Sequence, residues 1–235
     1  MKNSILCVAV VLTFLSCADN TTTVREEEPP RCPDAPVVHT GSATYYSFAD
    51  GGGNCLFDPT PNDLMVGAMN TADYDGSNIC GSCVRVTGPH SSIVIRIVDR
   101  CPECAKGWID LSPLAFQQLA DTSEGVVPIS WEVVPCDVTG PIEYHFIQGS
   151  NQWWTAVQIR NHRNPVLSLE YLTPNGFVGV FRRMYNYFVD STGMGPGPFT
   201  FRVTDVYGHT LVDSGIVHRE NASVPGRAQF PQCPQ

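Results

Sequence analysis

The most informative segment of this chain is Ile97-Val98-Asp99-Arg100-Cys101-Pro102-Glu103-Cys104-Ala105-Lys106-Gly107-Trp108-Ile109-Asp110-Leu111-Ser112-Pro113. Two acidic residues, Asp99 and Asp110, end apolar runs on either side of a short loop that holds two cysteines. Residues 91–98 predict a buried or half-buried β-strand with Asp99 at its end. Residues 114–120, just after Asp110, predict a short helix.

The two carboxylates allow two interpretations. A carboxylate beside apolar neighbours at a strand end can have a raised pKa and donate a proton. Acidic residues in turns also bond to backbone amides and then serve only the fold. The sequence pattern alone leaves both interpretations open for Asp99 and Asp110.

The first residues predict export. A basic start, an apolar run over residues 5–15 and a small residue at Ser16 predict a signal peptide over residues 1–16. The run is too short to span a bilayer. The segment also resembles a bacterial lipoprotein cleavage site, which would leave a lipid anchor on Cys17. Phe14 stands where such sites usually have Leu, so free secretion stays open. Residues 17–36 are polar and predict an extended tether.

The cysteines of the exported part predict disulfides. Beyond Cys17 there are eight of them, and an even count in an exported chain favours disulfide bonds. The alternative is zinc, because Cys80-Gly81-Ser82-Cys83 and Cys101-Pro102-Glu103-Cys104 have the spacing of a zinc ribbon. We expect disulfides, and we expect no metal or other cofactor.

The net charge of the chain limits the classes of molecule that it is expected to bind. A net charge of −9 argues against nucleic acid, which needs a basic stripe, and against strong attraction to acidic wall polymers. A neutral carbohydrate suits an exported chain that bears aromatic residues, and we expect a monomer.

The length after the tether suits two domains of about a hundred residues each. The first, residues 37–139, alternates short apolar runs with turn residues, and the runs are 43–48, 65–69, 83–87, 93–98 and 129–134. The second, residues 140–235, has seven runs without helical periodicity, at 142–147, 155–160, 166–172, 177–181, 185–189, 199–204 and 210–212. Their spacing predicts two packed antiparallel sheets.

The pair Trp153-Trp154 stands before one of these runs. Alternation along residues 155–160 places Val157 and Ile159 inward, and its backward extension sends Trp153 inward and Trp154 outward. If the strand begins only after the pair, both rings can lie on the surface. Exposed flat rings suit the apolar faces of sugars.

The order of these pieces resembles an expansin, and most of all the microbial expansin-like proteins. Six segments carry the resemblance, which extends from about residue 41 to 230: Gly41-Ser42-Ala43-Thr44-Tyr45-Tyr46, Ile79-Cys80-Gly81-Ser82-Cys83, Asp99 with Asp110-Leu111-Ser112-Pro113, Gly149-Ser150-Asn151-Gln152-Trp153-Trp154, Val157-Gln158-Ile159-Arg160-Asn161-His162 and Met184-Tyr185-Asn186-Tyr187-Phe188-Val189. The resemblance implies an all-β chain, with a six-stranded double-psi β-barrel followed by an immunoglobulin-like β-sandwich that binds cellulose.

The resemblance also implies site residues. Thr44, Asp99 and Asp110 match groove positions of the barrel, and Asp110 is the carboxylate that matters most. The aromatic platform of the second domain matches Trp153, Trp154 and Tyr185. Bacterial members have a Tyr in the groove where Cys101 stands, so a neighbour such as Tyr46 or Trp108 would have to supply that sugar contact.

The plant-like Cys-Gly-Ser-Cys segment implies the disulfides Cys55–Cys80 and Cys83–Cys136, with a local Cys101–Cys104 bridge. This leaves Cys32 to pair with Cys233.

The implied function is non-hydrolytic loosening of a cellulose-type β-glucan. Two alternatives remain. Related barrels hydrolyse β-1,4-glucans, with Asp110 as general acid and either Asp50 or Asp99 as the second carboxylate. The chain could also bind carbohydrate without loosening it. We expect a secreted or cell-envelope protein.

Overall fold

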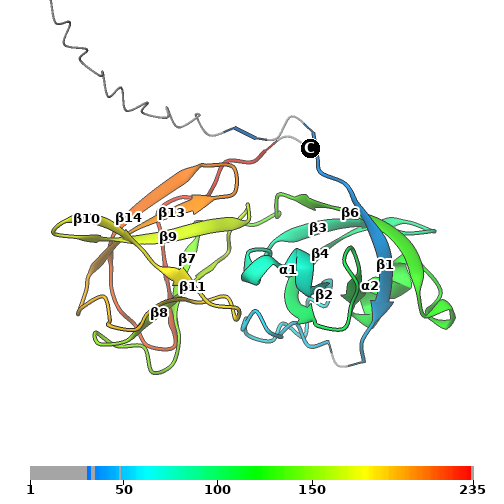
Figure 1. The fold of residues 1–235 in the computed structure, drawn as a ribbon, viewed down its shortest axis with the longest axis horizontal. Coiled ribbons are helices and arrows are strands. Elements are labelled where there is room, and N and C mark those ends of the chain that lie inside the picture. Colours follow the sequence, from blue (N-terminus) through cyan, green and yellow to red (C-terminus); the bar gives the residue numbers. More distant parts are fainter. Residues whose placement is uncertain (1–30, 33–34, 48, 234–235) are drawn as a thin grey trace, which may run out of the picture.

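The computed structural model describes residues 31–32, 35–47 and 49–233. The predicted signal peptide and Cys17 lie outside the described residues. The described chain forms two β-rich bodies side by side, a barrel and a pair of antiparallel sheets (Figure 1). This architecture confirms the predicted fold class. Within the described ranges, no helix combines the length and the apolar character that crossing a bilayer requires.

Six strands close the barrel in the order β1-β5-β2-β4-β3-β6. The pairs β1–β5 and β2–β4 are parallel, and the other pairs are antiparallel. The strands are β1 (His39–Tyr45), β2 (Val66–Asn70), β3 (Cys83–Thr87), β4 (Ser92–Cys101), β5 (Ile109–Leu111) and β6 (Val127–Val134). Short helical elements interrupt them at α1 (Thr71–Tyr74), η1 (Asp75–Ser77), α2 (Pro113–Leu119) and η2 (Thr122–Glu124).

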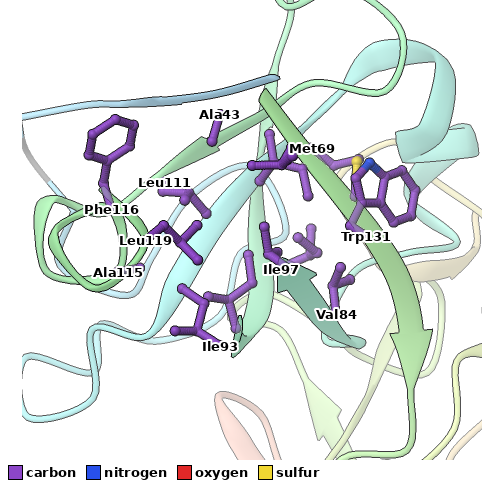
Figure 2. Packing of buried hydrophobic residues seen from close by; sticks show 14 of the residues in the cluster. Ala43, Met69, Val84, Ile93, Ile97, Leu111, Ala115, Phe116, Leu119 and Trp131 are labelled. Atoms are coloured by element: carbon purple, nitrogen blue, oxygen red, sulfur yellow. The ribbon is translucent and has the colours of Figure 1, made fainter. Parts of the chain in front are cut away.

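Helix α2 begins at a sequence that favours a helix start. The Ser112 hydroxyl accepts a hydrogen bond from the amide of Ala115 at 3.0 Å, and Pro113 occupies the first helical position. The helix buries Phe116 and Leu119 in the barrel core, which Figure 2 shows together with Ile97 and other apolar side chains. Helix α1 was not predicted, because four residues are too few to show a period.

Strand β4 is longer than the sequence indicated. It continues through Asp99 to Cys101, so Asp99 lies within the strand and not at its end. The reason is the parallel ladder with β2, which shifts register after Gly67 and then pairs Asn70 with Cys101. Long-range pairing of this kind is not visible in local sequence.

The second body has a four-stranded sheet, β10-β9-β13-β14, and a five-stranded sheet, β11-β12-β8-β7-β15. Their strands are β7 (Glu143–Phe146), β8 (Thr155–Arg160), β9 (Val166–Thr173), β10 (Gly176–Gly179), β11 (Phe181–Arg182), β12 (Phe188–Asp190), β13 (Phe199–Asp205), β14 (Thr210–Ile216) and β15 (Ala222–Pro225). The predicted run 177–181 is divided between the sheets, because the chain passes from β10 to β11 at Val180. Strand β15 was missed, since it has no apolar run.

All eight described cysteines are paired, as the resemblance implied. The disulfides are Cys32–Cys233, Cys55–Cys80, Cys83–Cys136 and Cys101–Cys104. The four cysteines of the zinc-like pattern therefore do not remain as thiolates for a metal. The first of these bonds joins the two ends of the described chain, near the position marked C in Figure 1.

Candidate functional site

Asp110 lies on β5 beside Thr44 of β1. The parallel ladder sets these two residues in register, and the Thr44 hydroxyl donates to Asp110 Oδ1 at 2.5 Å. Burial raises the pKa of the Asp110 carboxyl above its ordinary value. The hydrogen bond from Thr44 opposes this shift, whereas the charges of Glu103 and Asp99 add to it. Asp110 is therefore a half-buried acid that holds its proton more firmly than a surface aspartate.

Asp99 and Asp110 flank one residue of the barrel wall. Ala68 of β2 is the register partner of Asp110 on one side and of Asp99 on the other. Because neighbouring strands lie about 4.8 Å apart, the Cα atoms of the two aspartates are about 10 Å apart. With Thr44 next to Asp110, the three predicted groove residues lie in one row across the barrel.

The environment of Asp99 supports the structural interpretation of that residue. Its Oδ1 atom accepts the backbone amides of Asn54 at 2.6 Å and Arg100 at 2.7 Å. Gly53 has a φ of +151°, and a Cβ there would stand 2.4 Å from the Cβ of Asp99. The backbone of residues 53–54 thus fits tightly over this carboxylate, and only glycine allows that approach.

Tyr46 joins the same row. Burial raises the pKa of its phenol, and the charges of Asp99, Asp110 and Asp50 raise it further. Its hydroxyl is buried and has no hydrogen-bond partner among the described residues. Because this hydroxyl is covered, only the exposed part of the Tyr46 ring can contact a sugar. Cys101, by contrast, is buried in its bridge to Cys104.

The two tryptophans lie before β8 and not in it. Strand β8 begins at Thr155, and Asn151 Oδ1 accepts the amides of Trp153 and Trp154 in a tight turn. The backward alternation was therefore wrong: the Trp153 side chain is 73% exposed and Trp154 is half-buried. The alternative, in which the strand starts after the pair, is the one the structure adopts.

Trp154 and Tyr185 pack on one face of the five-stranded sheet. They cover a small cluster formed by Ala156, Tyr187 and Val189. The same alternation that places Val157 and Ile159 inward places Ala156 and Gln158 outward, and both do lie on this outer face. Both are nevertheless buried. The aromatic side chains cover Ala156, and the side-chain amide of Gln158 donates to the carbonyl oxygen of Cys55 in the barrel domain.

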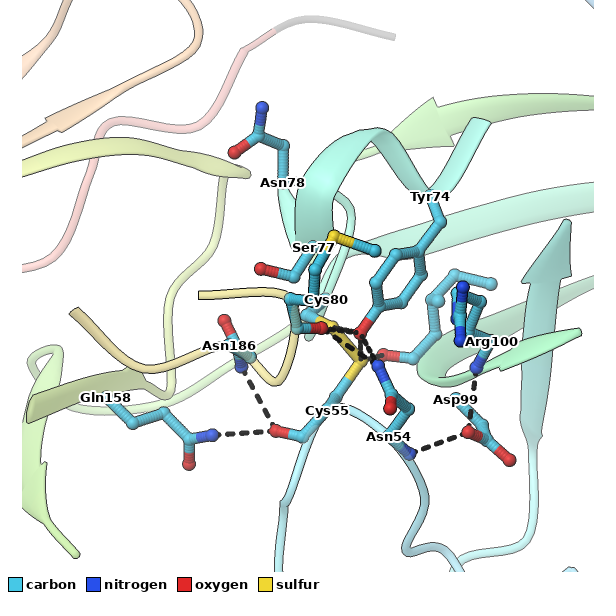
Figure 3. The surroundings of a disulfide bond; sticks show 12 residues. Asn54, Cys55, Tyr74, Ser77, Asn78, Cys80, Asp99, Arg100, Gln158 and Asn186 are labelled. Atoms are coloured by element: carbon cyan, nitrogen blue, oxygen red, sulfur yellow. Dashed lines mark hydrogen bonds between the residues drawn. A yellow bond between two sulfur atoms is a disulfide. The ribbon is translucent and has the colours of Figure 1, made fainter. Parts of the chain in front are cut away.

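The segment after Gly53 bonds to both bodies: Figure 3 shows Asn54 beside Asp99 of the barrel and Cys55 beside Gln158 of the sandwich. The side-chain amide of Asn54 donates to the carbonyl oxygen of Met184 at 2.8 Å, and the Tyr74 hydroxyl donates to the same oxygen at 2.9 Å. Met184 directly precedes Tyr185. Next along the segment, the carbonyl of Cys55 accepts the side-chain amide of Gln158 at 2.8 Å.

Sequence reasoning did not find Asn54 and Tyr74. Both act through contacts to residues more than a hundred positions away, which leave no local signal. The available hint was the run Gly51-Gly52-Gly53, which indicates a backbone that must approach another part of the chain closely.

A family model described as lytic transglycolase matches residues 38–131, which form most of the barrel. Over nearly its whole length the chain is similar to Expansin-YoaJ of Bacillus subtilis, at 37% identity over 204 residues, or 83% of this chain and 88% of that protein. Expansin-like protein 1 of Dictyostelium discoideum is 32% identical over 90% of this chain and 76% of its own length.

Two solved structures have the same fold. The crystal structure of apo Clavibacter michiganensis expansin is 31% identical, with a TM-score of 0.76 over 83% of this chain and 99% of that one. A mutant of that expansin, in complex with cellohexaose, is 30% identical, with a TM-score of 0.77 over the same shares. The barrel, the sandwich and the sequence similarity over most of the chain agree, and the chain belongs to the expansin family.

Proposed function

We propose that this protein binds cellulose or a related β-glucan and loosens its packing without cutting it. The observation that carries the proposal is the pair of hydrogen bonds by which Asn54 connects the barrel to the sandwich. Asn54 bonds to Asp99 of the barrel and to the carbonyl oxygen of Met184, the residue before Tyr185, and this supports a surface on which one glucan chain contacts both the carboxylates and the rings.

The aromatic face supplies the affinity. The ring of Trp153 is largely exposed, which is costly in water unless a ligand covers it. The cellohexaose complex of the Clavibacter expansin supports a β-glucan as that ligand. Each ring that covers about 100 Å² of apolar sugar surface contributes ~2.5 kcal/mol. Association costs at least ~4 kcal/mol, so three rings give weak binding to one short chain.

The barrel row supports loosening over hydrolysis. A glycoside hydrolase needs an acid and a second carboxylate, about 5–9.5 Å apart, on opposite sides of the bond. Asp110 has the raised pKa of an acid. Asp99 uses one oxygen to hold two backbone amides, and the exposed Asp50 accepts the amide of Gly52 at 2.8 Å. Neither environment favours a base, and this supports the exchange of hydrogen bonds between sugar hydroxyls and the groove.

The setting of this activity is outside the cell. Four disulfides and membership of the expansin family favour an extracellular protein. A lipid anchor at Cys17 would hold the protein at the cell envelope, and cleavage without lipid would release it as a monomer. A mass measurement of the protein purified from its membrane and medium fractions distinguishes these forms.

One experiment separates the three candidate functions. Clamped strips of cellulose-rich wall are extended under constant load with the purified protein, and the medium is analysed by mass spectrometry for released oligosaccharides. Extension without released sugar is the expected result. Sugar release in proportion to protein would support the hydrolase with Asp110 as general acid. Binding with neither effect would leave a carbohydrate-binding module.

A further inference from the structure

The edge strand β11 carries an aromatic side chain that the groove and platform positions do not include. Phe181 is 69% exposed. It is the register partner of Val189, which in turn pairs with Ala156. Directly opposed residues of antiparallel strands project to the same face. Ala156 and Val189 support Trp154 and Tyr185, so Phe181 projects from the face that bears those rings.

Phe181 lies beside the row formed by Trp153, Trp154 and Tyr185. The tryptophans precede β8 and Tyr185 lies in the turn between β11 and β12, so the row crosses the sheet obliquely from the start of β8 toward that turn, and Phe181 lies to one side of it. Strand β11 is two strands to the side of β8, a lateral distance of about 10 Å. A single extended sugar chain that follows the row therefore does not also cover Phe181.

Local contacts hold Phe181 in this orientation. Its neighbour Arg182 points to the other face, where it stacks on Phe188 at 5.1 Å and donates to the carbonyl of Val166 at 2.7 Å. The exposed guanidinium of Arg183 lies 5.1 Å from the centre of the Phe181 ring. An exposed ring that is already ordered loses little entropy on binding.

We infer that Phe181, flanked by Arg183, contacts a second glucan chain that lies beside the one on the main row. The preferred ligand is then a sheet of parallel chains, as on the surface of an insoluble glucan, and not an isolated chain. Phe181 would cover the apolar face of a sugar ring, while Arg183 offers donors to its hydroxyls. This inference rests on the proposed function and names the physical form of its substrate.

The test compares two forms of the same sugar. Binding of Phe181→Ala and Phe181→Leu is measured by depletion onto microcrystalline cellulose and by calorimetry with soluble cellohexaose. Both variants are expected to lose about tenfold in affinity for the insoluble form, equal to ~1.4 kcal/mol, with cellohexaose affinity unchanged within about twofold. Phe181→Tyr keeps a flat ring and should bind both forms like the parent.

Leu172→Ala is the matched control. Leu172 is an apolar side chain, 49% exposed, on β9 in the other sheet, and its loss should change neither affinity. An equal loss on both sugars would place Phe181 in the single-chain row and overturn the inference. Unchanged binding to both would show that no second chain is contacted. Trp153→Ala tests the proposed function separately, since unchanged binding there would remove the platform itself.

Discussion

The side-chain amide of Asn54 lies 2.8 Å from the carbonyl oxygen of Met184, across the junction between barrel and sandwich. The backbone amide of the same asparagine donates to Asp99. One residue thus bonds to the groove carboxylate and to the loop that carries Tyr185. This contact holds the barrel beside the loop that carries Tyr185.

Asn54→Ala should uncouple the barrel row from the aromatic face. The variant keeps the backbone bond to Asp99 but loses the bond to Met184, which Tyr74 still satisfies in part. We expect a stability loss of about 1 kcal/mol. Wall extension should fall several-fold, whereas cellohexaose affinity should stay within about twofold, since the aromatic rings remain. Calorimetry and creep on the same preparation give the comparison.

Asn78→Ala is the control for Asn54. Asn78 also faces the junction, where its side-chain oxygen accepts from Arg182 at 3.4 Å, but it has no bond to a groove residue. Extension by this variant should match the parent. If both variants lose extension equally, the junction acts only through its overall stability, and Asn54 has no special coupling role.

Trp153→Ala and Trp154→Ala should change the free energy of unfolding by different amounts but lower cellulose affinity equally. Trp153 is largely exposed, so its loss should change the free energy of unfolding by less than about 0.5 kcal/mol. Trp154 packs on Ala156, Tyr187 and Val189, and its loss should cost about 1–3 kcal/mol. Both should lower cellulose affinity about tenfold. Denaturant melts and depletion assays measure the two effects, and a large stability loss for Trp153→Ala would return that ring to the core.

Most strands could be predicted because short apolar runs and turn residues mark them locally, and their spacing predicted the sandwich. The barrel was implied only by the resemblance to expansins, and the short strand β5 was not among the predicted runs. Strand β8 was predicted with its true bounds, since Val157 and Ile159 alternate with smaller or polar residues. Trp153 was misplaced by the same rule, because Asn151 accepts the amides that a strand would have paired. A side-chain cap of this kind ends the period without a break in hydrophobicity.

The candidate site was only partly predictable. Asp99 and Asp110 stand out in the sequence as acids after apolar runs, but their common partner Ala68 does not. Their meeting depends on a parallel and an antiparallel ladder around β2. Asn54, which joins the groove to the aromatic face, is one polar residue in a turn and acquires its role only from distant backbone carbonyls.

His162 should make stability depend on pH. It is buried, its Nδ1 lies 2.9 Å from the carbonyl oxygen of Asn164, and burial followed by the charge of Arg182 lowers its pKa to about 4. The unfolded chain takes up this proton below pH 6.5, the ordinary value, whereas the folded chain does not until about 4. Stability should therefore fall on acidification through this window, by up to ~1.4 kcal/mol per pH unit.

His162→Gln should reduce that slope, whatever it does to stability at neutral pH; part of the slope remains, because burial also lowers the pKa of His145 to about 4. His90→Gln is the control, because His90 is exposed and its replacement should leave the slope as in the parent. Urea melts at half-unit steps between pH 4 and 7 give both slopes. An unchanged slope in His162→Gln would mean that other groups carry the acid sensitivity.

Asp110→Asn should abolish wall extension and stabilise the fold. Burial raises the pKa of this carboxyl in the folded chain above its ordinary 3.8. Its contribution to stability is therefore complete below that value and is lost as pH rises through the raised pKa. An amide cannot ionise and still accepts the Thr44 hydrogen bond, so the variant should melt above the parent near pH 7 and with it below about pH 4.

The predicted effect on wall extension also depends on the protonation of the Asp110 carboxyl. If extension depends on its protonated form, the parent should work best in mildly acidic medium, and its activity should decline as pH rises through the raised pKa. Asp110→Asn should keep cellohexaose affinity within about twofold, because the aromatic rings supply the binding. Asp137→Asn, an exposed aspartate, is the control for the loss of one negative charge and should extend walls like the parent. Full extension by Asp110→Asn at every pH would exclude Asp110 from the mechanism and leave the aromatic face as the only working part of the surface.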